Sequence, residues 1–398
     1  MKRGQIPLIA AVALDMTGFG MIIPDIQTRA ERFLKAEAWV YPPFITPGVI
    51  IGLILSSMFI IQFFVSPIWG AKSDRLGRKN VFVACTLLSA VSMGIYALAT
   101  TSLLLFLSRV LAGFGGANVA VAQAGVADAS DGEGRTVALG HLSAAQSGGL
   151  IAGPFFGGLV AKFLGSEWVG WIAMGLSLVG VLAVWFFGKF ASSEKVGTRK
   201  KFGFGPLVKE FPNLLPLVIL AGAAWFSLST LEGTFGRLLK AVWGYGEFEF
   251  GMLFGFESVV GLVVQGLLLA WLVKILKEKQ LLWGGYLMQG IGLAMTPFVP
   301  NLVGLFAASL FFAFGTAVAN PTVNGLCSKS VGEERQGEVF GVIQSARSVG
   351  FMLGPLIGGA LFDYWNALPY LFAGGICLVV ALFAPMALPR HGESAVEG

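Results

Sequence analysis

The sequence predicts an all-α membrane protein, and three observations lead to this fold class. Hydrophobic residues make up 56% of the 398-residue chain and charged residues only 12%, whereas a soluble domain carries roughly 25% charged residues. Apolar runs of the roughly 20 residues that cross a bilayer as a helix recur along the whole chain. The 55 glycines suit helices that pack closely in lipid. Such a composition can cover a lipid-facing surface but not a water-facing one.

Twelve membrane-spanning helices are expected, six in each half of the chain. Their ranges are 6–24, 48–70, 80–100, 103–127, 136–161, 168–188, 213–235, 250–273, 280–299, 302–325, 337–361 and 367–388. A polar stretch near the middle separates the halves. The expected parts are therefore an N-terminal six-helix bundle (1–188), a cytoplasmic linker loop (189–212), a C-terminal six-helix bundle (213–388) and a short cytoplasmic tail (389–398).

The distribution of basic residues predicts that both termini are cytoplasmic. With that orientation, most of the 27 Lys and Arg residues fall in cytoplasmic segments, many of them in the central loop, as the positive-inside rule requires. One outer segment, 25–47, breaks the rule because it carries Arg29, Arg32 and Lys35. Its length and its Tyr-Pro-Pro sequence predict a short surface structure.

The two halves also resemble each other in sequence. GLIAGPFFGG in the fifth expected span matches GFMLGPLIGG in the eleventh, at a separation of about half the chain. The glycines and prolines of this motif are Gly149, Gly153, Pro154, Gly157 and Gly158, and then Gly350, Gly354, Pro355, Gly358 and Gly359. They predict bent, closely packed gating helices in two parallel repeats, a transporter arrangement that places the substrate site between the repeats. Small-residue packing without a gating role is the alternative.

The loop between the second and third spans carries a dense charged motif, GAKSDRLGRK. It resembles the signature loop of the major facilitator superfamily at Gly70, Asp74, Arg75, Gly77, Arg78 and Lys79. The resemblance implies the major facilitator fold and a cytoplasmic latch in which Arg75 pairs with Asp128, the acid that ends the fourth helix. A basic inner loop without a latch is the alternative.

The fourth span contains SRVLAGFGGAN, which resembles the fourth-helix motif of the same superfamily. Arg109 in this motif is expected inside the membrane, where an unpaired cation costs at least ~2.5 kcal/mol. In antiporters of the superfamily the matching arginine is tied to proton handling, and the Gly-Pro motif of the fifth span resembles the mark of that antiporter branch. The alternatives for Arg109 are a structural ion pair and a side chain that extends to the outer interface.

The first span contains LDMTGFGMIIPDIQ, which resembles the first helix of twelve-helix drug/proton antiporters, and of the tetracycline exporters most of all. Gln27 stands where that pattern has its last proline. Asp15 is expected roughly 14 Å into the membrane at 1.5 Å per residue, where loss of hydration favours an uncharged carboxyl. Asp15 is therefore a candidate for proton coupling or substrate binding, and a structural, hydrogen-bonded aspartate is the alternative.

Three more charged side chains fall within expected spans. Glu232 lies near the outer end of the seventh, Glu257 lies about two turns inside the eighth, and Arg347 lies midway along the eleventh. Arg347 there requires an acidic partner or an anionic substrate. Eight amides are candidates either to line a polar cavity or to form helix–helix hydrogen bonds: Gln62, Asn118, Gln123, Gln146, Gln265, Asn320, Asn324 and Gln344.

Several kinds of chemistry are not expected. The three Cys and two His residues form no ligand cluster in sequence, so neither a metal site nor any cofactor is predicted. The phosphate-loop sequence of ATP-hydrolysing proteins is absent, and no paired catalytic groups indicate an enzyme. An ion gradient is therefore the expected source of energy for transport, and the acidic residues within the spans favour protons as the coupling ion.

Residues and resemblance together predict a secondary active transporter that works by alternating access. The favoured interpretation is a proton-coupled antiporter for the efflux of small amphipathic compounds or drugs. Its expected partners are a small-molecule substrate, protons and the lipid bilayer, without nucleic acid, and the chain is expected as a monomer in a bacterial inner (plasma) membrane. Transport of sugars, other metabolites or lipids is one alternative. A non-transporting receptor or an enzyme on the same scaffold is the other.

Overall fold

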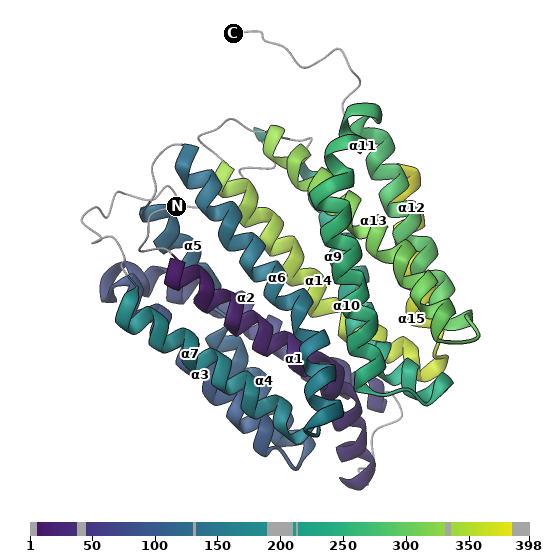
Figure 1. Cartoon of the computed structure of the whole chain (residues 1–398), viewed down its shortest axis with the longest axis horizontal. Coiled ribbons are helices and arrows are strands. Elements are labelled where there is room, and N and C mark those ends of the chain that lie inside the picture. Colours follow the sequence, from purple (N-terminus) through teal and green to yellow (C-terminus); the bar gives the residue numbers. More distant parts are fainter. Residues whose placement is uncertain are drawn as a thin grey trace. The chain divides into compact units, whose positions relative to one another are not determined.

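The computed structural model of the chain describes residues 6–37, 45–129, 133–188, 210–211, 214–330 and 336–383. These residues form helices and short turns and contain no strand (Figure 1). The chain divides into two compact units, Met1–Thr198 with Phe235–Gly255, and Arg199–Thr234 with Phe256–Gly398. The expected linker, except Glu210 and Phe211, and the expected tail lie outside the described residues.

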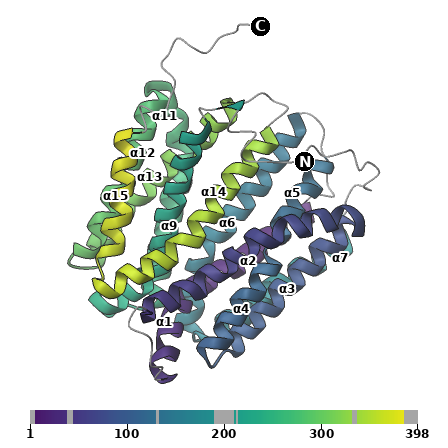
Figure 2. The same ribbon diagram turned by 180° about the vertical axis from the view of Figure 1, so that it is seen from behind.

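The first unit is built from the helices of the first half of the chain. They are α1 (Ile6–Glu37), α2 (Pro47–Leu76), α3 (Arg78–Leu98), α4 (Ser102–Gly115), α5 (Asn118–Asp128), α6 (Glu133–Phe163) and α7 (Glu167–Phe187). The end of α9 (Leu214–Trp243) and the start of α10 (Glu247–Val263) also belong to this unit. α1 packs against α6 and α7 (Figure 1), α3 packs against α4 and α7, and α2 packs against α4 (Figure 2).

Local sequence sets several helix starts. Thr46 precedes α2, and its side chain accepts a hydrogen bond from the Val49 amide at 3.4 Å. Thr101 caps α4 in the same way through the Leu104 amide at 3.2 Å. These side chains satisfy amides that the first turn of a helix leaves unpaired. Between α2 and α3, Gly77 has φ of +89°, which glycine adopts without steric cost.

The first helix is longer than the sequence predicts. The expected span ended at residue 24, yet α1 continues through Pro24 to Glu37. Pro24 removes one backbone hydrogen bond, but Ile26, Ala30 and Leu34 beyond it are buried in the core, and this burial outweighs the local cost. The part of the outer segment up to Glu37 is therefore helix, and residues 38–44 lie outside the described residues.

The second unit is built from the helices of the second half. They are α9 up to Thr234, α10 from Phe256, the π-helical η2 (Val264–Leu268), α11 (Leu269–Ile275), α12 (Glu278–Met295), the 3₁₀-helical η3 (Thr296–Phe298), α13 (Leu302–Lys329), α14 (Gln336–Tyr364) and α15 (Leu368–Phe383). α12 packs against α13 and α15, and α14 also packs against α15. α10, η2 and α11 run without a break as one helical stretch, Glu247–Ile275.

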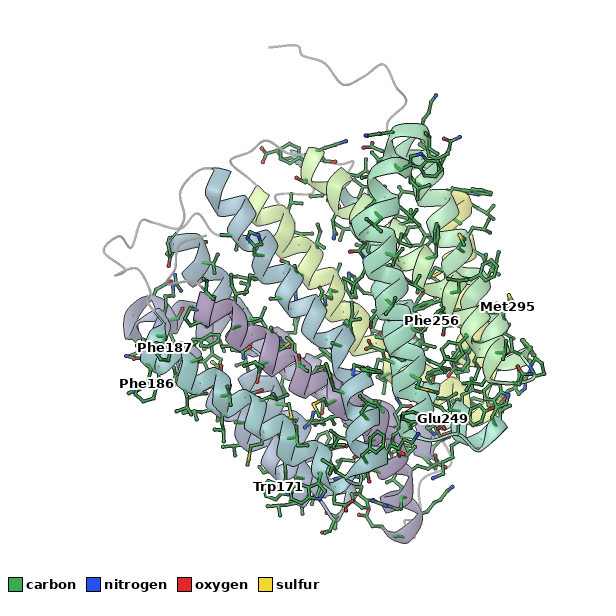
Figure 3. The ribbon with its side chains drawn as sticks, in the orientation of Figure 1. Trp171, Phe186, Phe187, Glu249, Phe256 and Met295 are labelled. Atoms are coloured by element: carbon green, nitrogen blue, oxygen red, sulfur yellow. The ribbon has the colours of Figure 1, made fainter. Side chains whose placement is uncertain are left out.

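Nine helical stretches among the described residues are long and apolar enough to cross a membrane, and Leu368–Phe383 is apolar but shorter. On the first unit, α7 exposes Trp171, Phe186 and Phe187 (Figure 3), with exposed fractions of 37%, 70% and 71%. Large exposed aromatic side chains are stable in this position only against an apolar solvent such as lipid. The predicted all-α membrane fold is confirmed, while the count of twelve spans stays a prediction.

Candidate functional site

Asp15 on α1 is buried in a polar cluster of the first unit. Its carboxylate oxygens accept hydrogen bonds from Asn118 Nδ2 at 2.8 Å and from Ser177 Oγ at 2.7 Å. Asn118 Nδ2 also lies 3.3 Å from Thr86 Oγ1. The cluster thus joins α1, α5, α7 and α3, and only 1% of Asp15 is exposed. These partners are neutral, so the described residues around Asp15 form no ion pair that would fix its charge.

Arg109 on α4 lies in a second buried cluster rather than beside Asp15. Its Nε donates to Ser108 Oγ at 3.2 Å, and its guanidinium lies 5.1 Å from the centre of the Tyr96 ring. Nη1 has no hydrogen-bond partner, although only 1% of the residue is exposed. Among the described residues, Arg109 forms no ion pair. A buried cation of this kind is costly, which indicates a role beyond packing.

The cluster around Arg109 contains three residues that the sequence analysis did not identify as site residues. Tyr96 donates a hydrogen bond to Asp25 Oδ2 at 2.6 Å, and Asp25 is paired with Arg29 at 2.8 Å. The Arg29 guanidinium also lies 4.7 Å from the centre of the Tyr96 ring, so the ring contacts two guanidinium groups. The i,i+4 spacing of Asp25 and Arg29 could have indicated this ion pair in the sequence. It was missed because the expected first span ended at residue 24, before both residues.

The second unit brings Glu232, Glu257 and Arg347 together. Arg347 on α14 acts electrostatically on Glu232 of α9, and Glu232 in turn repels Glu257 of α10. Ser309 hydrogen-bonds Glu257. The Arg347 guanidinium lies 4.4 Å from the centre of the Trp225 ring. All three charged residues are partly exposed, in contrast to Asp15 and Arg109.

The amides predicted to line a cavity are divided between the two units. Asn118 belongs to the Asp15 cluster. Gln62 Nε2 donates to the carbonyl oxygen of Gly116 at 2.8 Å, where the helix breaks between α4 and α5, so it forms the helix–helix bond that was its alternative. Gln146 is buried, Gln265 is exposed on η2, and the others are partly exposed: Gln123, Asn320, Asn324 and Gln344. Their place in a cavity stays a prediction.

The glycine motifs make close helix contacts in each unit. A Cβ at Gly153 on α6 would lie 2.5 Å from Gly20 Cα of α1, and the Met21 backbone similarly crowds Gly157. In the second unit, a Cβ at Gly350 on α14 would lie 2.7 Å from the Phe226 amide of α9. Ser229 Oγ of α9 donates to the Gly350 carbonyl at 2.8 Å. The repeated motif therefore places α6 on α1 and α14 on α9 in corresponding ways.

The latch motif is ordered around Arg78 rather than Arg75. The Arg78 side chain, 4% exposed, donates from Nε to Asp128 Oδ2 at 2.9 Å and also pairs with Asp74 and with Ser73 Oγ. The predicted Arg75–Asp128 pair is therefore wrong. Arg75 lies on the exposed side of the last turn of α2, whereas Arg78 begins α3 directly after the Gly77 turn and points into the space beside the end of α5.

Replacing Arg78 by glutamine is expected to destabilise the chain by about 1–3 kcal/mol, because Asp74 and Asp128 lose a buried cation that joins them. This is less than the roughly 3–5 kcal/mol for breaking a fully buried pair, because Asp128 is 36% exposed and thus partly hydrated. Arg75→Gln is the matched control and is expected to change stability by less than about 0.5 kcal/mol. Thermal unfolding of the purified variants in detergent measures both, and equal effects would contradict the assignment.

Membrane-length helices that bury Asp15 and Arg109, with a second, partly exposed acid–arginine cluster, indicate an integral membrane transporter. The family model described as Major Facilitator Superfamily matches residues 7–353 and 217–397. The chain therefore belongs to the major facilitator superfamily, whose members carry small molecules across membranes and are not enzymes.

Similar proteins span nearly the whole chain. The tetracycline resistance protein of class C from Escherichia coli is 26% identical over 95% of both chains. Multidrug resistance protein 2 from Bacillus subtilis (strain 168) is 28% identical over 94% of this chain and 92% of its own. A bacterial homolog of the human lysosomal transporter Spinster, solved in an inward-facing and unoccupied conformation, has the same fold, with a TM-score of 0.74 and 16% identity over 96% of both chains.

Proposed function

We propose that the chain is a proton-coupled exporter of small amphipathic compounds that works by alternating access. Substrate leaves the cytoplasm as protons enter, so export draws on the proton gradient. The two relatives described above carry tetracycline resistance and multidrug resistance in their names, and both align over nearly the full length. Export of such compounds is therefore the activity that these relatives favour for this chain.

The proposal includes a membrane arrangement. Twelve helices cross the inner membrane of a bacterium as two six-helix bundles, 1–188 and 213–388, with both termini in the cytoplasm, and the chain works as a monomer. The charge distribution supports this topology, because most of the 27 basic residues then face the cytoplasm. The corresponding packing of Gly153 against α1 and of Gly354 against α9 supports the two repeats.

The observation that carries the coupling is the environment of Asp15. A carboxyl group that is 1% exposed and held only by Asn118, Ser177 and other neutral groups can exist with or without its proton. A carboxylate paired with a buried arginine would stay charged and could not serve as a proton carrier. Asp15 therefore has the surroundings that a proton carrier within a membrane requires.

The acid–arginine cluster of the second unit supports a role in the same cycle. Glu257 has a hydroxyl partner, Ser309, whereas Glu232 shares its surroundings with Arg347. Because the three charged groups are partly exposed and lie near Trp225, they offer charge and an aromatic face to an amphipathic compound. We assign Glu257 to proton or substrate binding and Arg347 with Glu232 to substrate contact.

Proton flux in vesicles tests the proposal. The purified chain is reconstituted with an entrapped pH dye, and tetracycline or a cationic amphipathic dye is added. Wild-type protein is expected to move protons when substrate is present. Asp15→Asn and Glu257→Gln are each expected to lower this flux roughly 10-fold or more, since each removes a group that binds and releases a proton.

Glu278→Gln is the matched control for these variants. Glu278 is an exposed carboxylate paired with exposed Lys329 at 2.5 Å, and its loss is expected to leave coupled flux unchanged. Unchanged coupling in both Asp15→Asn and Glu257→Gln would refute the proton assignment. Flux driven by sugars or other metabolites, with none from the amphipathic compounds, would replace drug export by the alternative substrate class.

A further inference from the structure

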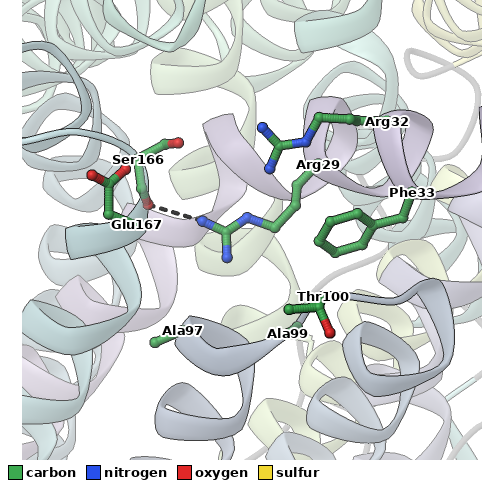
Figure 4. Close-up of a pocket in the computed structure, with 8 residues that line it drawn as sticks. All are labelled: Arg29, Arg32, Phe33, Ala97, Ala99, Thr100, Ser166 and Glu167. Carbon is green, nitrogen blue, oxygen red and sulfur yellow. Dashed lines mark hydrogen bonds between the residues drawn. The ribbon is translucent and has the colours of Figure 1, made fainter. Parts of the chain in front are cut away.

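One end of the first unit contains an open pocket that borders the Arg109 cluster at Arg29 and has no assigned ligand in the proposed function. Its volume is about 410 Å³, within the roughly 300–1,000 Å³ typical of small-molecule sites. The pocket lies where α1 and α3 end and α7 begins, and Figure 4 shows Arg29, Arg32, Phe33 and Glu167 among its lining residues. It includes two of the three basic residues that break the positive-inside rule in the sequence.

Arg29 forms the buried part of this pocket and keeps one donor unused. Its guanidinium pairs with Asp25 at 2.8 Å and donates to the carbonyl oxygens of Tyr96 at 3.1 Å and Ser166 at 2.9 Å. Its Nε has no hydrogen-bond partner, although the residue is only 4% exposed. A buried donor without a partner costs free energy that a bound acceptor would recover.

Arg32 adds a positive charge at the exposed part of the pocket. Its guanidinium lies 5.6 Å from the centre of the Phe33 ring, and it forms no ion pair with a described residue. The carboxylate whose charge it feels, Asp25, is already paired with Arg29. Asp25 balances Arg29, so Arg32 and Glu167 are the remaining positive and negative groups of the pocket, and this favours a ligand that carries both an anionic and a cationic group.

The first turn of α7 contributes both signs of charge. Ser166 precedes the helix but makes no side-chain capping bond, so the positive end of the helix dipole faces this region without a side-chain cap. Glu167, exposed on the same turn, would repel a bare phosphate or sulfate ion, but it can bind an ammonium group. A ligand that carries a phosphate and an amine a few ångströms apart satisfies Arg32, the Arg29 Nε and Glu167 together.

We propose that this pocket binds a phosphoethanolamine group, with its phosphate on Arg29 and Arg32 and its ammonium on Glu167. The pocket lies at the end of membrane-length helices, at the level of lipid headgroups, so a phosphatidylethanolamine headgroup is one source and a soluble phosphoethanolamine ester is the other. The site is separate from the Asp15 cluster of the same unit, and the test of its occupancy requires no transported substrate.

Binding to delipidated protein tests the proposal without any transport measurement. Native mass spectrometry with phosphatidylethanolamine and phosphatidylglycerol is expected to show preferential retention of phosphatidylethanolamine. Arg32→Gln is expected to weaken its binding roughly 10-fold, through loss of one charged hydrogen-bonding partner. Glu167→Gln is expected to remove the preference over phosphatidylglycerol, which has no amine. Glycerophosphoethanolamine, which carries the headgroup without acyl chains, is added as competitor to assign the source. If it displaces phosphatidylethanolamine, the headgroup binds without acyl chains, and if phosphatidylethanolamine is retained, the site is assigned to the lipid.

Lys35→Gln is the matched control, because Lys35 lies on the same helix but pairs with Glu31 at 2.7 Å and does not line the pocket. Its binding is expected to equal that of the wild type. The proposal is overturned if Arg32→Gln binds as well as Lys35→Gln, or if wild-type protein retains phosphatidylglycerol at least as well as phosphatidylethanolamine. A failure of the proton-flux assay would not change the outcome of the lipid-binding measurement. The proposed function and the proposed binding site can therefore be refuted independently.

Discussion

Gly153→Ala is expected to destabilise the chain and to abolish transport. The added Cβ would lie 2.5 Å from Gly20 Cα and 2.7 Å from the Thr17 carbonyl oxygen. Both are backbone atoms of α1, so the clash is relieved only if one helix moves away from the other. Overpacking of this kind costs about 1–3 kcal/mol, which exceeds the gain of at most about 1 kcal/mol from alanine in a helix. Thermal unfolding in detergent and substrate flux in vesicles measure the two effects.

Gly148→Ala on the same helix is the matched control. Beyond the backbone of its own helix turn and its chain neighbours, no heavy atom lies within 4 Å of a Cβ at Gly148, so alanine there is expected to leave stability unchanged or to raise it slightly. The repeat provides a second comparison in the other unit, because a Cβ at Gly354 would lie 2.9 Å from the Thr230 amide of α9. Equal stabilities of the Gly153 and Gly148 variants would show that α1 and α6 do not pack as described.

This glycine motif also shows what the sequence could predict. The recurrence of Gly153-Pro154 as Gly354-Pro355 predicted closely packed helices at equivalent places in two repeats, and the structure has α6 on α1 and α14 on α9. Such contacts can be predicted from the sequence because a glycine pattern and an apolar run are local properties of the chain. The positions of Asp15 and Arg109 inside apolar runs could be predicted for the same reason.

Properties that depend on contacts between distant segments could not be predicted from the sequence. Arg75 and Arg78 have the same chemistry and lie three residues apart, and only the Gly77 turn and the place of Asp128 decide that Arg78 is buried. The continuation of α1 past Pro24 likewise depends on burial of residues 26–34 against other helices. Tyr96 became a site residue only because α3 brings it against α1 and α4. Each of these outcomes required the packing of the helices.

Arg109→Gln is expected to separate function from stability. Glutamine removes a buried cation that has no carboxylate partner among the described residues, so thermal stability in detergent is expected to stay the same or to rise. Coupled transport is expected to fall roughly 10-fold or more, because the Arg109 charge acts through Tyr96 on the Asp25–Arg29 pair. Unfolding curves and proton flux on the same preparations give the two quantities.

Arg237→Gln provides the contrast for Arg109. Arg237 is also a buried arginine of the first unit, with a side chain 8% exposed, but it pairs with Glu31 at 3.5 Å. Its loss leaves a carboxylate without its partner, so this variant is expected to be less stable than the wild type. If Arg109→Gln is destabilised as much as Arg237→Gln while its folded fraction still couples protons normally, then Arg109 is a structural cation, and the proton path has to run through Asp15 or Glu257 without it.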